Sequence, residues 1–529
     1  MSRFCRFYTF AVFAFWAVLA LWMACSMQRI VVFVLLALMA LPLVVSRRAR
    51  MAARNFICAA ARRWGVSLTV IILVGLAMRF YLLYEYPEEL VMTTSPEYHF
   101  VDGAILWKDA CQIASGVFPD TKSWTSAVLY GFVHFLLESY SAATVFSVIL
   151  QMLTCLLLFC IGCRVKNVVC GLVLCAAFYL AQGVSTYAFY VATENVFVFF
   201  SSLSILCLVS FVKNGNCRHP FLLCALGGIF AWLATWSRGE GGILLWCTFA
   251  GTVVLWYGVQ RKDLRGLVKA LSVLGLVFAC GVGVAYGVHD KIGTPRTILS
   301  SSDNLWPRLF GANVQSGGCC TLDEKREILV RYLKDHPECN WEGIDERWRR
   351  GRFEGDTEVP QPKCLNNRCP KELIPYIQEE IAARWGALSF TEKVMFVLRK
   401  ERVWSMDLGE PFSRTRLLYL FYKLYNRVTP VLFSFGTLLF IALLARRRIR
   451  LEFRDVLVLS IPFLLMAGMA AVFVFTEVSS RYTYVAYVFG SLPFAWLVGS
   501  LADKTRSETS ELCNSENAIR ICTGASECG

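Results

Sequence analysis

Long runs of apolar residues, separated by short polar stretches, recur along the whole chain. Each run is close to the roughly 20 residues that a membrane-spanning helix needs. The pattern predicts an all-α polytopic membrane protein with a bundle of about twelve transmembrane helices. The runs fall at about residues 8–26, 30–46, 66–84, 144–163, 168–184, 191–212, 219–236, 241–257, 267–288, 427–445, 456–475 and 483–501.

One apolar segment does not fit this parity. Residues 126–138, SAVLYGFVHFLLE, are too few to span, and a crossing there would reverse every later loop. Such an element is tolerated at membrane depth only where protein or a water-filled cavity satisfies its backbone. We therefore predict a half-helix or an interfacial helix that borders a cavity.

Basic residues gather in short clusters between the apolar runs. Cytoplasmic loops carry an excess of Lys and Arg, so these clusters place their loops on the cytoplasmic side of the cell membrane. The formal charge of +14 thus sets orientation and does not indicate nucleic acid, which would need one basic stripe with interleaved aromatic residues. The clusters are Arg47, Arg48, Arg50, Arg54, Arg62 and Arg63; Arg164 and Lys166; Lys213 and Arg218; Arg261, Lys262 and Arg265; and Arg446, Arg447, Arg448 and Arg450.

The two termini differ in character. The basic and apolar start of the chain has the look of a secretory signal, but a second apolar run begins within four residues, so we expect an uncleaved helical hairpin. This hairpin and the basic cytoplasmic loop that follows make up residues 1–64. Residues 503–529 are polar and lack aromatic residues, which predicts a disordered cytoplasmic tail.

The remaining chain divides into a core and two outer loops. We expect a transmembrane core at 65–288 with a first outer loop at 85–143, a large extracytoplasmic loop at 289–426, and further transmembrane helices at 427–502. Parts of the large loop have apolar residues at helical spacing, typical of surface helices that cap an apolar layer. The chain has 22 cysteines, and five lie in this loop, where an odd number leaves any disulfide pairing open: Cys319, Cys320, Cys339, Cys364 and Cys369.

Candidate functional residues lie on the outer side. Glu97, Asp102 and Asp109 cluster in the first outer loop, and further ionisable residues stand at outer helix ends. Any one of them has an ordinary explanation as a helix terminus, but ionisable groups near membrane depth, gathered on one side, indicate function. The helix-end residues are Glu194, Arg238, Glu240, Glu477 and Arg481.

Several motifs, in order over about residues 66–500, resemble the GT-C membrane glycosyltransferases, and within them family 39, which includes protein O-mannosyltransferases and the aminoarabinose transferase. Asp102 stands eight residues before Ala110 in an A-x-x-x-A-x-G pattern, and Thr193–Glu194 is similar to the family's outward-end acid. Further matches are TWSRGEGG at 235–242, FGANVQSGG at 310–318 and the pair Arg481–Tyr482. The sequence departs from the family in that Glu97 and Asp102 do not form an adjacent acidic pair.

The resemblance implies a GT-C-like bundle that transfers a sugar from a polyprenyl-phosphate-linked donor to an extracytoplasmic acceptor, which is a protein, lipid or envelope glycan. It assigns the general base to Asp102, with Glu97 in support. Arg238, Arg481 and Lys400 are then candidates for holding the lipid phosphate, and Glu194 for positioning hydroxyls. Glu240, Tyr482 and Asn313 belong to the same expected substrate site, and His99 is the weak candidate ligand for a divalent metal.

Two alternatives use the same residues. A multi-spanning transporter or lipid flippase would use the acids as coupling sites, although the large outer loop and the lack of obvious inverted repeats count against it. A ligase or polymerase of lipid-linked glycans would share the donor. Nucleotide-driven pumping and metalloprotease or serine-hydrolase chemistry find no matching motif.

Overall fold

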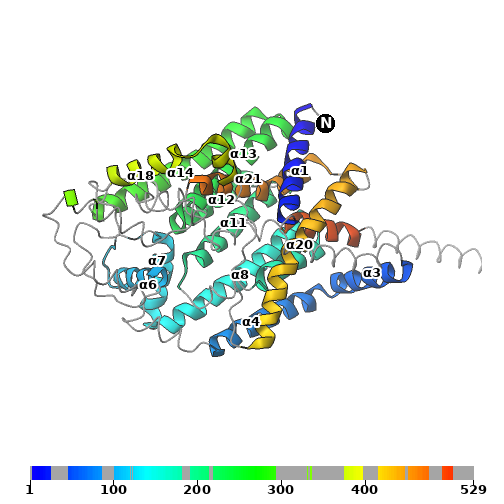
Figure 1. The fold of residues 1–529 in the computed structure, drawn as a ribbon, viewed down its shortest axis with the longest axis horizontal. Helices are drawn as coiled ribbons and strands as arrows, with labels where there is room; N and C mark the ends of the chain where they lie inside the picture. Colours follow the sequence, from blue (N-terminus) through cyan, green and yellow to red (C-terminus); the bar gives the residue numbers. More distant parts are fainter. Residues whose placement is uncertain are drawn as a thin grey trace, which may run out of the picture.

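The structure is a computed structural model that describes residues 3–24, 46–85, 101–119, 121, 123–181, 191–213, 219–292, 331, 334–335, 374–396, 415–446, 449, 451–475 and 491–503. All regular elements within these residues are helices (Figure 1), which confirms the prediction of an all-α protein. Six are long and apolar enough to cross a membrane: Trp64–Leu82, Tyr140–Val165, Thr193–Lys213, Pro220–Ser237, Gly242–Arg261 and Leu264–Lys291. The chain is a polytopic membrane protein.

The centre of the bundle is built from four consecutive helices. They are α8 (Tyr140–Val165), α9 (Val168–Tyr179), α11 (Thr193–Lys213) and α12 (Pro220–Ser237). Glycines let α8 and α9 approach closely, because a Cβ on Gly162 would stand 2.5 Å from the Cα of Gly171. Small residues at helix contacts are the usual route to tight packing in membranes. α11 lies deep in the bundle, and most of its residues are buried.

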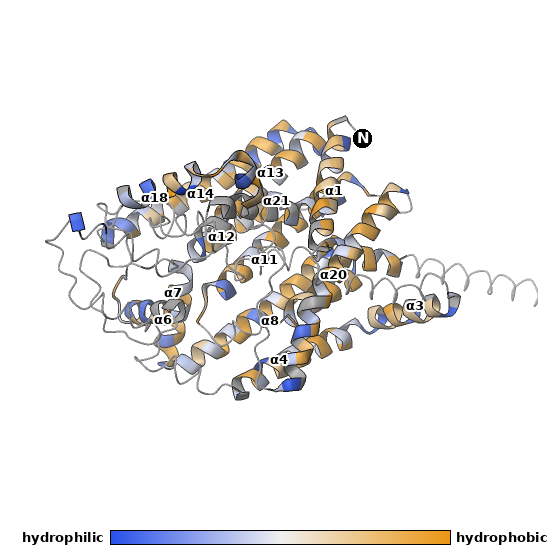
Figure 2. Cartoon of the chain, in the orientation of Figure 1, coloured by the Kyte–Doolittle hydropathy of each residue, from blue (hydrophilic) through white to orange (hydrophobic). Residues whose placement is uncertain are grey.

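Two groups of helices surround this centre. On one side, α13 (Gly239–Val254) runs into the π-helical turn η1 (Leu255–Arg261) and is followed by α14 (Leu264–Ile292). On the other, α1 (Arg3–Ala24) packs against α20 (Arg416–Ala445) and α21 (Phe453–Phe475), where Tyr8 donates a 2.8 Å hydrogen bond to Ser460. The surfaces of these helices are largely apolar (Figure 2), as lipid contact requires.

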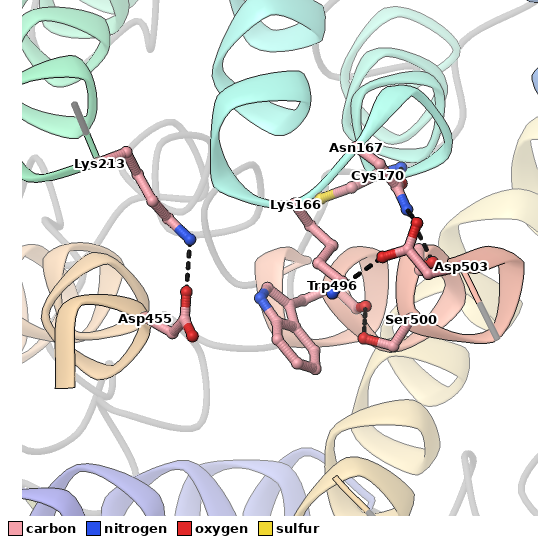
Figure 3. A network of polar contacts seen from close by, with 9 residues as sticks. Lys166, Asn167, Cys170, Lys213, Asp455, Trp496, Ser500 and Asp503 are labelled. Carbon is pink, nitrogen blue, oxygen red and sulfur yellow. Dashed lines mark hydrogen bonds and ion pairs between the residues drawn. The ribbon is translucent and has the colours of Figure 1, made fainter. Parts of the chain in front are cut away.

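Basic helix ends meet at one end of the bundle, as the charge pattern predicts. Lys166, in the turn between α8 and α9, pairs with Asp503 at the end of the helix Leu492–Asp503. Lys213 at the end of α11 pairs with Asp455 in the first turn of α21 (Figure 3). We call the end of the bundle with these two ion pairs the basic end. The opposite end, where the short helices α6 (Val101–Ala114) and α7 (Trp124–Leu137) lie, is called the outer end.

α3 (Arg47–Arg62) and α4 (Trp64–Glu85) follow each other along one side of the bundle (Figure 1). α3 lies in the segment expected as a basic loop, and Ser46 caps it by accepting a hydrogen bond from the backbone N–H of Ala49. A helix there fits its sequence, because alanines fill the spaces between the arginines.

Some helix boundaries differ from the hydropathy pattern. α9 ends at Tyr179, five residues before the apolar run ends, and α20 begins at Arg416, eleven residues before its apolar run. The 14 residues of α7 extend about 21 Å, too short to span, which agrees with a half-helix or interfacial helix. Its Phe132 and Phe135 are exposed and its Tyr130 is buried.

In the large loop the structure describes α18 (Ile374–Gly386) and a short helix at 390–396. Both fall where the sequence predicts amphipathic helices. Glu380 of α18 forms ion pairs with Arg384 and Arg331. Partial burial raises the pKa of Glu380, but these two guanidinium groups outweigh it and hold the pKa below its usual range. The loop cysteines lie outside the described residues.

Candidate functional site

An ion pair between a buried glutamate and a partly exposed arginine joins two helix ends at the outer end of the bundle. Glu194 is the second residue of α11 and is 6% exposed, and Arg238 is the residue between α12 and α13. Nη1 of Arg238 donates to Oε1 of Glu194 over 2.9 Å, and the hydroxyl of Thr193 donates to Oε2 over 3.1 Å. Each carboxylate oxygen therefore accepts a hydrogen bond and keeps further acceptor capacity, and the acid lies in the first turn of a helix, where the helix dipole favours negative charge.

The turn that carries Arg238 is tight. Arg238 has an extended backbone (φ −157°, ψ 99°), and its N–H bonds to Ala234 while its C=O accepts from Gly242. A Cβ on Gly242 would lie 2.2 Å from the Cα of Thr235, so only glycine allows α13 to fold back onto α12 at this point. The TWSRGEGG sequence thus holds its arginine at the apex of a helical hairpin.

α7 contacts chain neighbours of both members of the ion pair. The hydroxyl of Ser123 donates to the C=O of Ser237 over 3.0 Å, and Trp124 contacts Trp236 with ring centroids 6.4 Å apart. Farther along α7, the Tyr130 hydroxyl lies 2.8 Å from that of Ser147 on α8 and donates to the C=O of Ala192 over 3.4 Å. α7 and its preceding residue therefore contact residues just before Arg238 and just before Glu194 in the chain.

Asp102 is the second residue of α6, and α6 packs on α7. The A-x-x-x-A-x-G pattern explains this packing. Ala110 is fully buried against Gly131, whose absent Cβ would stand 2.8 Å from the C=O of Ala110, and Gly116 ends the helix in a left-handed conformation (φ 78°). Leu106 and Asp109, four and seven residues after Asp102 on α6, are buried.

The structure describes some of the predicted site residues in full, some by their backbone and others not at all. Glu194 and Arg238 are described in full and lie in contact, while of Asp102 and Glu240 the structure describes the backbone, each at the second position of its helix. The other candidates lie outside the described residues: Glu97, His99, Asn313, Lys400, Arg481 and Tyr482. Their place in the site stays a prediction.

A buried arginine that was not among the predicted residues is linked to this site through two side chains. Arg79, in the outer part of α4, is fully buried, and its Nε donates to Gln151 of α8 over 2.7 Å. Gln151 in turn donates to Asn195 of α11 over 2.9 Å, and Asn195 adjoins Glu194. The signal was present in the sequence, because a lone charge inside an apolar span is expensive and therefore suspect.

Oxygen, nitrogen and sulfur donors suited to a metal do not gather in the described part of the chain, where no three His, Cys, Asp or Glu side chains come together. His289 is buried near the end of α14, and His99, the candidate metal ligand, lies outside that part. What the described site offers is a carboxylate and a guanidinium held rigidly together. This combination is suited to binding a phosphate and orienting hydroxyl groups.

No family model and no curated protein matches the chain. The solved structures that it resembles include an oligosaccharyltransferase of Archaeoglobus fulgidus with zinc and sulfate, at TM-score 0.44 and 11% identity over 85% of this chain and 51% of that one. The archaeal oligosaccharyltransferase AglB of the same organism, with an inhibitory peptide and a dolichol-phosphate, matches at TM-score 0.45 and 11% identity over 86% and 52%. The chain thus spans about half the length of these two structures.

A third similar structure is ArnT from Cupriavidus metallidurans bound to undecaprenyl phosphate. It matches at TM-score 0.28 and 14% identity, over 82% of this chain and 78% of that one.

Proposed function

We propose that this protein is a membrane glycosyltransferase that moves a sugar from a polyprenyl-phosphate-linked donor to an acceptor on the extracytoplasmic side of the cell membrane. The observation that carries the proposal is the ion pair of the buried Glu194 with the partly exposed Arg238 at the outer end of the bundle, with the helix of Asp102 one helix away through α7. These residues come from three separate motifs that the GT-C resemblance assigns to one site.

The proposed reaction is a displacement at the anomeric carbon of the sugar. Asp102 accepts the proton of the acceptor hydroxyl as the bond from that oxygen to the anomeric carbon forms and the bond from carbon to phosphate oxygen breaks. The phosphate leaves with the negative charge, which Arg238 and Arg481 stabilise. A guanidinium has five N–H donors, so an arginine held through Nη1 retains a geometry that suits a bidentate phosphate contact.

Glu194 has two roles in this proposal. It fixes the Arg238 guanidinium before the donor arrives, which reduces the entropy lost on binding. It also places a carboxylate beside the phosphate site, where sugar or acceptor hydroxyls can donate to it. Glu97, Lys400, Asn313, Glu240 and Tyr482 complete the proposed substrate site, and the finer choice of sugar and acceptor is set by residues of the outer loops.

The distribution of acids disfavours the transport alternative. Within the six described spans the acidic residues are Glu194 and Asp290, and each stands at one end of its helix. Acid-coupled transport through these spans would place carboxylates at mid-membrane depth, along the pathway of the ion. Acids at the outer helix ends fit a reaction at the membrane surface.

The experiment that tests the proposal measures transfer of a labelled sugar from polyprenyl-linked donors by the purified protein in lipid nanodiscs. Asp102→Asn should reduce transfer by about 10²–10⁴-fold, the range in which a general base contributes. Asp109→Asn changes the other candidate acid of the same helix and shows whether the loss is specific to Asp102. Wild-type protein that transfers nothing from any polyprenyl phosphate or diphosphate would overturn the proposal, and near-normal transfer by Asp102→Asn would remove Asp102 from the role of base.

A further inference from the structure

The buried arginine of α4 makes contacts in two directions. Nη1 of Arg79 donates to the C=O of Gly75 in its own helix over 2.8 Å and to the C=O of Tyr179, the last residue of α9, over 3.0 Å. The guanidinium carbon also lies 3.8 Å from the centre of the Tyr179 ring. A cation at the carboxyl end of a helix satisfies carbonyls that lack partners within the helix and meets the negative end of the helix dipole.

Gly75 makes this approach possible. A Cβ on Gly75 would stand 2.3 Å from Cδ1 of Tyr179, so a larger residue would push the tyrosine away from the arginine. The early end of α9, five residues before its apolar run stops, therefore coincides with a site on α4 shaped to receive it. Arg79 is held in place by α4 and α9 together.

The second direction leads to the candidate active site. A guanidinium can only donate hydrogen bonds, so the contact from Nε of Arg79 fixes the oxygen of the Gln151 amide towards α4. The nitrogen of the same amide must then point away, and it donates to Oδ1 of Asn195. Arg79 thus sets the direction of two consecutive amide side chains, and the second adjoins Glu194 in the first turn of α11.

We propose that Arg79 is a positioning residue that fixes the first turn of α11, and with it the Glu194–Arg238 pair, through Gln151 and Asn195. The inference rests on the proposed function for its catalytic meaning. The physical argument is that Gln151 and Asn195 are 1% and 2% exposed, so an amide turned the wrong way would leave buried polar atoms unsatisfied. The intact chain of hydrogen bonds therefore fixes the first turn of α11 relative to α4 and α8.

Hydrogen–deuterium exchange of the full-length protein in nanodiscs tests the positioning itself. Gln151→Leu removes both hydrogen bonds of the amide, and Gln151→Glu keeps an acceptor for Arg79 but loses the donor to Asn195. Both should speed exchange in the first two turns of α11, residues 193–200, by about tenfold, the effect of losing a buried hydrogen bond. Thr154→Val is the matched control, because Thr154 is buried on α8 and bonds Leu150 of its own helix.

The outcomes separate positioning from general loosening. Unchanged exchange at 193–200 in Gln151→Leu would overturn the proposal, and so would an equal increase in Thr154→Val. Arg79→Lys, which keeps the charge and loses the planar fork, should raise exchange as Gln151→Leu does; unchanged exchange in an Arg79→Lys protein that folds would also overturn it.

The catalytic consequence has its own readout. Gln151→Glu should raise the apparent KM for the lipid donor about tenfold, whereas a merely structural role would lower Tm and leave KM as it is. An unchanged KM would overturn the link to the site. If the wild-type protein transfers no sugar, the proposed function fails, but the exchange experiment still decides whether Arg79 positions α11.

Discussion

The two ends of the bundle use the same chemistry for different purposes. At the basic end, Lys213 and Lys166 pair with acids that lie 242 and 337 residues later in the chain, and these pairs tie α11 and the α8–α9 turn to α21 and the C-terminal helix (Figure 3). At the outer end, Glu194 and Arg238 are only 44 residues apart and join two neighbouring helix ends that already pack together.

The surroundings of the pairs differ as well. Lys166 also lies 4.9 Å from the centre of the Trp496 ring, and Asn167 donates to both Asp503 and the C=O of Gly499, so the basic end is a set of contacts between helices. The outer pair lies beside α7 and near the chain of Arg79, Gln151 and Asn195. The outer pair is not needed to hold its helices together, yet its carboxylate is buried and accepts hydrogen bonds from both Arg238 and Thr193, which indicates a functional role.

The largest expected effect in this comparison is that of Arg238→Gln. Removing the guanidinium takes away the proposed phosphate ligand and leaves the buried Glu194 with the hydroxyl of Thr193 as its remaining donor among the described residues. Hydrogen bonds to charged groups contribute about 1.5–3 kcal/mol, so the apparent KM for the donor should rise by about 10–100-fold. Steady-state transfer kinetics check this, with Arg238→Lys as an intermediate case. A donor KM that stays at the wild-type value would show that Arg238 does not bind the phosphate.

Gly242→Ala should come next, because a Cβ there collides with the backbone of Thr235 and must open the hairpin that holds Arg238. Overpacking of this kind costs about 1–3 kcal/mol of stability, and transfer should fall with it. The matched control is Gly251→Ala on the same helix, where a Cβ meets nothing within 4 Å, and it should be neutral or slightly stabilising. Thermal unfolding of both variants in detergent decides between them, and equal losses would contradict the account of the hairpin.

At the basic end we expect a loss of stability with normal transfer. Lys213→Met leaves Asp455 with the backbone N–H of Glu452 as a remaining donor. The free energy of unfolding should fall by about 1–2 kcal/mol, in the lower part of the range for a polar group that loses its partner. The apparent donor KM should not change. A tenfold rise in KM without loss of Tm would show that the basic end takes part in the reaction.

The smallest effect is expected for Asp503→Asn. Asp503 is half exposed, and exposed ion pairs contribute about 0–1 kcal/mol. An asparagine also keeps an oxygen that can accept from Asn167. Tm and transfer should both lie within error of the wild-type protein, and a large drop in Tm would mean that the C-terminal helix holds the bundle more strongly than its exposure indicates.

The sequence predicts most of the fold and part of the site, for physical reasons. Apolar runs locate helices, and the basic clusters correctly place Lys166 and Lys213 at one end. Hydropathy does not show where a helix stops inside an apolar run, so the end of α9 at Tyr179 depends on Arg79 from another helix. For Glu194 and Arg238, the sequence predicts only that both lie at helix ends on the same side of the membrane; their contact depends on the packing of α11 against α12.

Buried polar chains are harder to predict. Gln151 and Asn195 are unremarkable along the sequence, since each is a single polar residue in an apolar helix, and their connection depends on how α4, α8 and α11 pack. Arg79 is the exception, because a charge within an apolar span is visible in the sequence alone. Its partner Gln151, which lies 72 residues later on another helix, is not.

The most direct test of the central claim exchanges the charges of each pair and measures sugar transfer. Lys213→Asp with Asp455→Lys restores a pair at the basic end, at a small cost because both charges then oppose the helix dipoles. Glu194→Arg with Arg238→Glu does the same at the outer end. We predict near-normal transfer for the first double variant and a loss of at least about 100-fold for the second at comparable Tm, because the phosphate site then carries the wrong charge. Equal transfer by the two variants would contradict the assignment of the outer pair to catalysis.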